Sequence, residues 1–394
     1  MPKINDAISG IEEEGAFGVL DRAMALKGDG KPIINLGIGQ PDFNPPEHVL
    51  EAAARAARDG PHGYTSPVGI GPLREAVAAR VAARYGVPVT AGEVVIVPGG
   101  KVTIFFSCML FGGAGSEILY PDPGFPPYRE AVRAAGAKAV PYPIREERDF
   151  GFDGEEVLSL ITPRTRLIIL NSPANPTGGV TARDELVKLV AGLARHPEVM
   201  ILSDEIYSDL VFDGAPFASL MEFPELRERT ILLDGWSKTY AMTGWRLGYG
   251  VWPLPLVDHV RKLITVDHSC VNGPAQMAAL AAVTGPQDAV AAMRQSFAER
   301  REHVVRGLNR LPNVTCRMPG GAFYAFPNVG ATGWSSRELA GRLLEEAFVA
   351  LVPGESFGAN GAGYVRFSYA AGLADIEEAL ARMALFLVTA RPRT

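Results

Sequence analysis

Short apolar runs that end in loops of glycine, proline and polar residues recur along the chain, and they constrain its fold more than any other feature. The longer runs, predicted to be strands, lie at residues 93–97, 117–120, 164–170, 199–202 and 230–233. Shorter strands are predicted at 32–36, 320–326, 349–353 and 364–369. Helices are predicted within residues 1–30, at 46–59, from 101 to about 110, from about 257, at 272–283 and at 286–311.

The composition is that of an ordinary globular protein, with 394 residues, 47% of them apolar and 21% charged. A net charge of −6 provides no basic field for nucleic acid or an anionic membrane. Three scattered cysteines favour a reducing compartment over a disulfide scaffold. We see neither a signal peptide nor an apolar run near the ~18 residues of a membrane span, so a cytoplasmic protein without membrane partners is expected.

Residues 233–249, LDGWSKTYAMTGWRLGY, follow the apolar run at 230–233 and contain two cations that suggest a cofactor site. Lys238 comes just after a predicted buried strand, where partial desolvation favours the neutral amine that attacks aldehydes to form a Schiff base. Arg246 lies eight residues further on and is a fork-shaped partner for a phosphate. Aldehyde and phosphate together suggest pyridoxal phosphate. Taken alone, the pair is more simply two solvated cations on a loop.

Three loops at the ends of predicted strands offer further polar groups. Gly99, Gly100 and Lys101 lead into a helix whose first N–H groups can seat a phosphate, although helix capping is the usual explanation for such a turn. NSPANPTGG at 171–179 follows a strand, at the position where open α/β sheets bind ligands. Asp204 and Tyr207 converge after another strand. No histidine or second carboxylate cluster lies at metal-ligand spacing from them, which argues against a metal site there.

These segments resemble, in the same order and over nearly the whole chain, the class I/II aminotransferases, the fold-type I pyridoxal phosphate enzymes. The matching strings include YTSPVGIGPLR, NSPANPTG, DEIY and GWSK followed by GWRLG. The resemblance implies an α/β fold with a large domain, whose mostly parallel central sheet is flanked by helices, and a smaller α/β domain built from both chain ends. The expected divisions are an N-terminal arm with part of the small domain at 1–45, the cofactor domain at 46–285 and the C-terminal small domain at 286–394.

The resemblance also implies an activity, the transfer of an amino group from an L-amino acid to a 2-oxo acid by a ping-pong mechanism. Lys238 would be the covalent and acid–base residue, Asp204 the partner of the pyridine nitrogen and Tyr207 a donor to the ring oxygen. Asn175 would bond the same oxygen, and Phe125 would stack on the ring. The other implied cofactor ligands, which hold the phosphate, are Gly99, Gly100, Lys101, Ser237, Arg246 and, from the partner subunit of a homodimer, Tyr64.

Substrate binding would fall to Gly39, Asn175 and Arg366, with Arg366 as the clamp on the α-carboxylate. Side-chain specificity stays open in the sequence. Lys101 favours acidic substrates, Phe125 and Phe323 tolerate aromatic ones, and an acidic run at 12–14 would suit basic ones if it lined the pocket.

Two positions depart from the family's usual pattern. Gly235 stands where many members have a phosphate-binding serine, so the phosphate would depend more on the other ligands. Phe125 lacks the indole N–H of relatives that carry tryptophan, which weakens any claim of strict aspartate specificity.

Other functions remain open on the same scaffold, namely a lyase, a decarboxylase or an oxidase. A transcriptional regulator is disfavoured by the acidic charge and by the lack of a helix-turn-helix before residue 30. A scaffold protein without chemistry is disfavoured by the presence of Lys238, Asp204 and Arg246 together.

Overall fold

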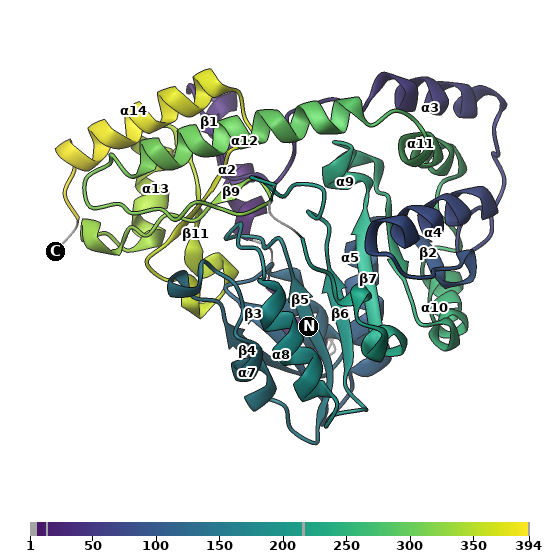
Figure 1. Cartoon of the computed structure of the whole chain (residues 1–394). Helices are drawn as coiled ribbons and strands as arrows, with labels where there is room; N and C mark the ends of the chain where they lie inside the picture. Colours follow the sequence, from purple (N-terminus) through teal and green to yellow (C-terminus); the bar gives the residue numbers. More distant parts are fainter. Residues whose placement is uncertain (1–5, 13–14, 215–216, 393–394) are drawn as a thin grey trace.

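A computed structural model describes residues 6–12, 15–214 and 217–392 of the chain (Figure 1). Strands and helices alternate through most of this length, and two regions can be distinguished, one around a large sheet and one around smaller sheets. None of the helices in the described part is both long and apolar enough to cross a bilayer.

The larger sheet has seven strands in the order β2-β8-β7-β6-β5-β3-β4. Their bounds are β2 Val94–Val97, β3 Glu117–Asp122, β4 Lys138–Pro143, β5 Thr165–Asn171, β6 Met200–Asp204, β7 Thr230–Gly235 and β8 Gly248–Val251. β8 runs antiparallel to both of its neighbours, and the remaining pairings are parallel. The carboxyl ends of all strands except β8 therefore meet at one edge of the sheet.

Helices cover both faces of this sheet. Successive side chains of a strand point to opposite faces, and both sets are apolar here, so both faces are buried under helices. On β2, Val94 and Ile96 pack in the cluster that contains α4 and α11, whereas Val95 and Val97 pack in the cluster of α5 and α10. The helices of this region are α3 Glu47–Asp59, α4 Gly71–Tyr85, α5 Lys101–Phe111, α6 Pro127–Ala134, α7 Gly154–Ser159, α8 Arg183–Leu193, α9 Trp236–Thr239, α10 Leu254–Asp267 and α11 Gly273–Thr284.

The second region joins the two ends of the chain. β1 pairs in parallel with β10, which places Ile34 beside Val349, and β9 and β11 flank β12. Its strands are β1 Ile34–Asn35, β9 Tyr324–Ala325, β10 Val349–Ala350, β11 Val352–Pro353 and β12 Val365–Ser368. Its helices are α2 Gly15–Gly28, α12 Asp288–Leu308, α13 Ser336–Glu346 and α14 Leu373–Thr389, whereas α1 Asp6–Ser9 packs against α6 of the large-sheet region. Figure 1 shows α12 running from the neighbourhood of α11 across to α14.

The expected fold class is confirmed, and most predicted strands lie where the sequence placed them. The strand predicted at 320–326 was too long, since only Tyr324–Ala325 pairs with β12. The preceding residues turn instead, and the Ala322 amide donates to the Leu210 carbonyl. Two strands were not predicted, β4, which contains two prolines, and β8, in which two of the four residues are glycine.

Candidate active site

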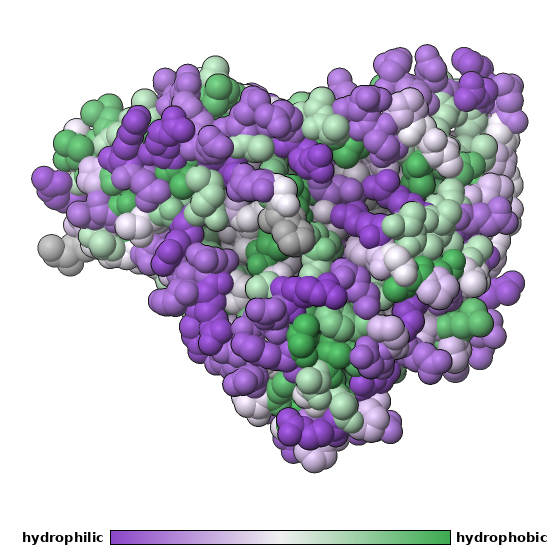
Figure 2. All heavy atoms as spheres, viewed as in Figure 1, coloured by the Kyte–Doolittle hydropathy of each residue, from purple (hydrophilic) through white to green (hydrophobic). Residues whose placement is uncertain are grey.

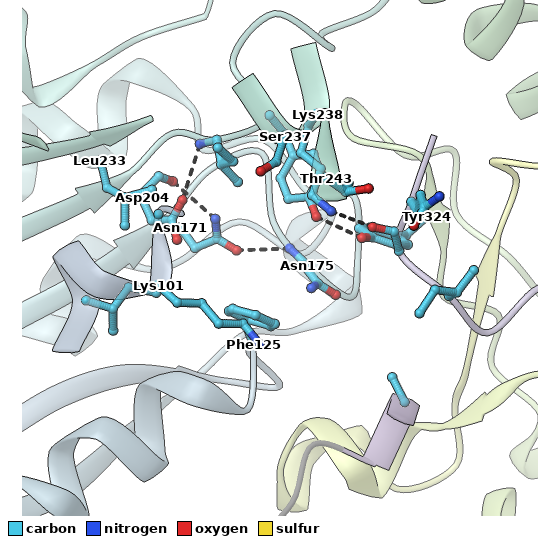
Figure 3. A pocket seen from close by; sticks show the side chains of 18 of the residues that line it. Lys101, Phe125, Asn171, Asn175, Asp204, Leu233, Ser237, Lys238, Thr243 and Tyr324 are labelled. Carbon is cyan, nitrogen blue, oxygen red and sulfur yellow. Dashed lines mark hydrogen bonds between the residues drawn. The ribbon is translucent and has the colours of Figure 1, made fainter. Parts of the chain in front are cut away.

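A cavity of about 450 Å³ opens at the carboxyl ends of the parallel strands, between the large sheet and the smaller sheets. In the space-filling view, hydrophobic side chains are visible in a hollow near the centre of the face shown (Figure 2). Figure 3 shows how side chains from the separate strand ends and loops converge on this space. The predicted site residues that line it are Gly39, Gly100, Lys101, Phe125, Asn175, Asp204, Tyr207, Ser237, Lys238, Arg246 and Arg366.

Asp204 ends β6 at the floor of the cavity and is fully buried. Its Oδ2 accepts from the Tyr128 hydroxyl at 2.8 Å and its Oδ1 from the Ile206 amide at 3.2 Å. Burial raises the pKa of Asp204 to about 6, against the lowering effects of these two hydrogen bonds and of the Lys238 charge. A buried carboxyl of this kind is stabilised as an anion when a cationic N–H group lies against it.

Asn171, the last residue of β5, hydrogen-bonds both the neighbouring strand β6 and the loop that follows β5. Its side-chain Nδ2 donates to the Asp204 carbonyl at 3.1 Å, and its Oδ1 accepts from the Asn175 amide at 2.9 Å (Figure 3). The loop that carries Asn175 is therefore fixed to the strand that carries Asp204. These hydrogen bonds give Asn171 a structural role in the loop.

Arg366 enters the cavity from β12 and is 1% exposed. Nη1 donates to Asn175 Oδ1 at 2.8 Å and Nη2 to the Gly37 carbonyl at 2.5 Å. Among the described residues, Nε has no hydrogen-bond partner. The rings of Tyr324 and Phe357 lie 4.6 and 4.8 Å from the guanidinium carbon. A shielded guanidinium whose partners here are neutral is suited to an anionic ligand.

Lys238 follows β7, as predicted, but lies in the short helix α9 and not in a loop. Its Nζ donates to the carbonyl of Gly39, a residue of the loop that follows β1. The rings of Tyr207 and Phe323 lie 5.9 and 5.7 Å from Nζ. The amine is thus partly desolvated and directed into the cavity, as the reactivity expected of it requires.

Arg246 and the start of α5 form the other end of the cavity. Arg246 has a positive φ of 54°, and its Nη1 donates to the Thr243 carbonyl at 2.7 Å. Gly99, at φ +97°, packs so closely on the guanidinium that a Cβ there would overlap with Nη2. Gly100 is the N-cap of α5, so the positive end of the helix dipole and the Arg246 guanidinium make this end favourable for a phosphate.

Three other groups of predicted residues lie elsewhere. Gly99 supports Arg246 without lining the cavity, and Tyr64 is 91% exposed outside it. Glu12 accepts from Arg129 and so is already engaged by a cation, whereas positions 13 and 14 fall outside the described residues. Within the described residues, no group of three or more His, Cys, Asp or Glu side chains could hold a metal ion.

Two tyrosines of the cavity were missed in the sequence. Tyr128 follows Phe125 by three residues, so a helix predicted to begin near 126 would have placed both at one site. Tyr324 lies in a predicted strand, but alternation does not say which face of that strand meets the cavity.

Comparisons with known proteins agree with this geometry. The family described as aminotransferase class I and II matches residues 31–383. An aspartate aminotransferase of Geobacillus stearothermophilus is 36% identical, covering 98% of this chain and 99% of that protein. The aromatic-amino-acid aminotransferase 2 of Thermococcus litoralis is 38% identical over 96% of this chain and 97% of its own length. The structure of the aspartate aminotransferase from Thermus thermophilus with maleate has a TM-score of 0.93 and 34% identity, covering 98% of this chain and 100% of that one.

Proposed function

The chain belongs to the class I and II aminotransferases and is an aminotransferase, and we propose that its amino donors are dicarboxylic L-amino acids of the aspartate type. The observation that carries this proposal is the number of cations on the cavity wall. Lys238 and Arg246 are assigned to the cofactor, and two further cations, Arg366 and Lys101, also line the cavity. A substrate with two carboxylates satisfies both.

We propose pyridoxal phosphate as the cofactor, as membership of the family implies. The cavity fits it, because the buried Asp204 carboxyl suits a protonated ring nitrogen and the Arg246 end suits a phosphate. Tyr207 and Asn175 would bond the ring oxygen, and Phe125 would stack on the ring. Gly100, the backbone amide of Lys101 and Ser237 would help to hold the phosphate, and Gly99 would support Arg246. When bound, the cofactor acts as an electron sink for the bonds of the substrate Cα.

The residues of the chain then have distinct tasks. In its neutral form, Lys238 Nζ would take up the proton that leaves the substrate Cα. Arg366, assisted by Asn175, would fix the α-carboxylate and thereby select which Cα bond is aligned for cleavage. In the second half-reaction, Arg366 and Lys101 would hold the 2-oxo acid acceptor.

Lys101 is proposed to recognise the side-chain carboxylate. It is at the first turn of α5, and its Nζ lies 5.0 Å from the centroid of Phe125 and 5.6 Å from that of Phe17. The Thermus relative was solved with maleate, a dicarboxylate, which supports this choice. The same rings favour a second candidate substrate class, aromatic amino acids, in line with the Thermococcus relative.

We propose that the enzyme works as a homodimer in which Tyr64 of the partner subunit completes the phosphate site. Two features support this proposal. Tyr64 is 91% exposed in the single chain, and a second cavity of about 490 Å³ is lined by Arg246, Trp245 and Val271. Tyr64 of the partner subunit, if its side chain entered this second cavity, would reach the side of Arg246 that faces away from the first cavity.

The substrate assignment is tested by steady-state kinetics of Lys101→Met with aspartate and with phenylalanine as donors and 2-oxoglutarate as acceptor. Removal of the charge should lower kcat/KM for aspartate by about 10- to 100-fold and leave phenylalanine within a few-fold, since a charge-assisted hydrogen bond is worth about 1.5–3 kcal/mol.

The matched control is Lys27→Met, which removes an exposed lysine of α2 that does not line the cavity. Equal losses for both donors with Lys101→Met would show that the distal carboxylate is bound elsewhere.

A further inference from the structure

Tyr324 contacts three separate parts of the cavity with one side chain. It lies in β9, opposite Ser368 of β12, and is 1% exposed. Its hydroxyl is 2.7 Å from the Tyr207 hydroxyl, and its ring lies 4.6 Å from the Arg366 guanidinium carbon. The same hydroxyl packs on the Cα of Gly39, where an added Cβ would overlap with it.

The direction of the hydrogen bond between the two tyrosines matters because a phenol has one proton. Either hydroxyl can be the donor. If Tyr207 donates to Tyr324, the Tyr207 proton is no longer available to a ligand. If Tyr324 donates, Tyr207 accepts through its oxygen and its own proton is left for the cavity.

We propose that Tyr324 is a positioning residue that donates to Tyr207 and so directs the Tyr207 proton into the cavity. This inference rests on the proposed role of Tyr207 as a donor to the cofactor's ring oxygen. Since each hydrogen bond in such a chain polarises the next, the donation from Tyr324 also strengthens the bond that Tyr207 makes. The ring of Tyr324 has a second, separable task, because it covers Arg366.

The test is a set of tyrosine variants in the cofactor-loaded enzyme, read by the pH midpoint of the bound cofactor's absorbance. Tyr324→Phe keeps the ring and removes only the hydroxyl. It should raise the midpoint by about half a unit to one unit, because the negative ring oxygen loses part of its stabilisation. Tyr207→Phe should raise it further, and the double variant should match Tyr207→Phe alone.

Kinetics separate the hydroxyl from the ring. Tyr324→Phe should lower kcat by a few-fold and leave KM for the amino acid unchanged, whereas Tyr324→Leu should also raise KM by about 3- to 10-fold through the loss of the ring over Arg366. Tyr369→Phe is the control for losing a buried hydroxyl, since Tyr369 is fully buried in the same core and bonds the Ala322 carbonyl outside the cavity lining.

Two results would overturn the inference while the proposed function stands. In one, Tyr324→Phe titrates like the wild type. In the other, the shift it causes persists unchanged in the Tyr207→Phe background. A wild-type protein whose absorbance shows no bound cofactor would instead contradict the proposed function and, with it, this role of Tyr324.

Discussion

Asp204 and Asp234 show that a perturbed carboxyl by itself does not mark an active site. Burial raises the pKa of Asp204 to about 6, and burial together with the nearby Asp209 carboxylate raises that of Asp234 to about 7. Asp234 accepts from the Gly235 amide and the Tyr249 hydroxyl and does not line the cavity. Asp204 does line it, so its ionisation can respond to a ligand.

The raised pKa of Asp204 predicts a pH-dependent stability of the cofactor-free enzyme. Its ordinary value is 3.8 and its value in the folded chain is about 6, so the folded state binds the proton more tightly. Stability is therefore lost as pH rises from about 4 to about 6. The variant Asp204→Asn escapes this loss and should be more stable than the wild type at neutral pH, by up to about 3 kcal/mol.

Thermal unfolding of the cofactor-free wild type and Asp204→Asn at about pH 4.5 and about pH 7.5 measures the difference in stability between them. This difference should appear mainly at the higher pH. Saturating pyridoxal phosphate should reverse the order, because the aspartate then gains a cationic partner. Asp258→Asn, on the exposed side of α10, serves as the control. If cofactor-free Asp204→Asn were no more stable than the wild type at neutral pH, burial of the charged Asp204 carboxylate would not destabilise the fold.

At the scale of elements, the antiparallel pair β7 and β8 packs closely against the Gly99–Gly100 turn at the Arg246 end of the cavity. Gly235 and Gly248 stand opposite each other in the register. A Cβ on Gly235 would lie 2.8 Å from the Gly248 Cα, and one on Gly248 would lie 2.5 Å from the Gly100 amide nitrogen. Glycine at 235, noted in the sequence as a departure from the serine of many relatives, is thus required by close packing of backbone on backbone.

Gly235→Ser should consequently destabilise the enzyme even though it restores the residue of those relatives. The new side chain meets backbone that cannot rotate away, and overpacking of this kind costs about 1–3 kcal/mol. Chemical denaturation of the cofactor-free protein measures the change.

The control is Gly341→Ala in α13, where no atom lies within 4 Å of the added Cβ. It should stabilise the protein by about 0.5–1 kcal/mol, because alanine is the better helix former. If Gly235→Ser left the free energy of unfolding unchanged, β7 and β8 would be able to move apart locally and accommodate the new side chain.

At the scale of the whole molecule, the cavity depends on contacts between distant parts of the chain. Arg366 of β12 reaches Asn175 and the Gly37 carbonyl, and Lys238 reaches the Gly39 carbonyl. The pairing of β1 with β10 holds the loop at 37–43 beside the C-terminal region. The division of the chain at 45/46 and at 285/286 and the cytoplasmic location stay predictions.

The proposed dimer predicts that two impaired variants can restore each other. In a hybrid of Lys238→Ala and Tyr64→Ala subunits, one site carries both defects and the other has an intact Lys238 together with Tyr64 from the partner subunit. Mixing the two variants under conditions that exchange subunits should therefore recover activity, to about half the wild-type value per hybrid dimer. Activity that stays at the level of the separate variants would show that Tyr64 acts on its own chain's site or on none.

Several features of the fold and site could be predicted from the sequence because they depend on local patterns. Apolar runs bounded by turn residues identified most strands. Polar residues at the strand ends, together with the family resemblance, pointed to Asn175, Asp204, Tyr207 and Lys238, all of which line the cavity. Strands that escaped prediction lacked this local signal, as β4 and β8 do with their prolines and glycines.

What only the tertiary structure decided are the contacts that join segments far apart in the chain. The Tyr128 bond to Asp204, the Tyr324 bond to Tyr207 and the glycine contact at 235 each join residues whose spacing carries no periodic signal. Local sequence fixes backbone conformation and the side chains that follow each strand, because these depend on neighbours along the chain. The partner that each buried polar group meets depends on how the sheets and helices pack, and that packing is a property of the folded chain.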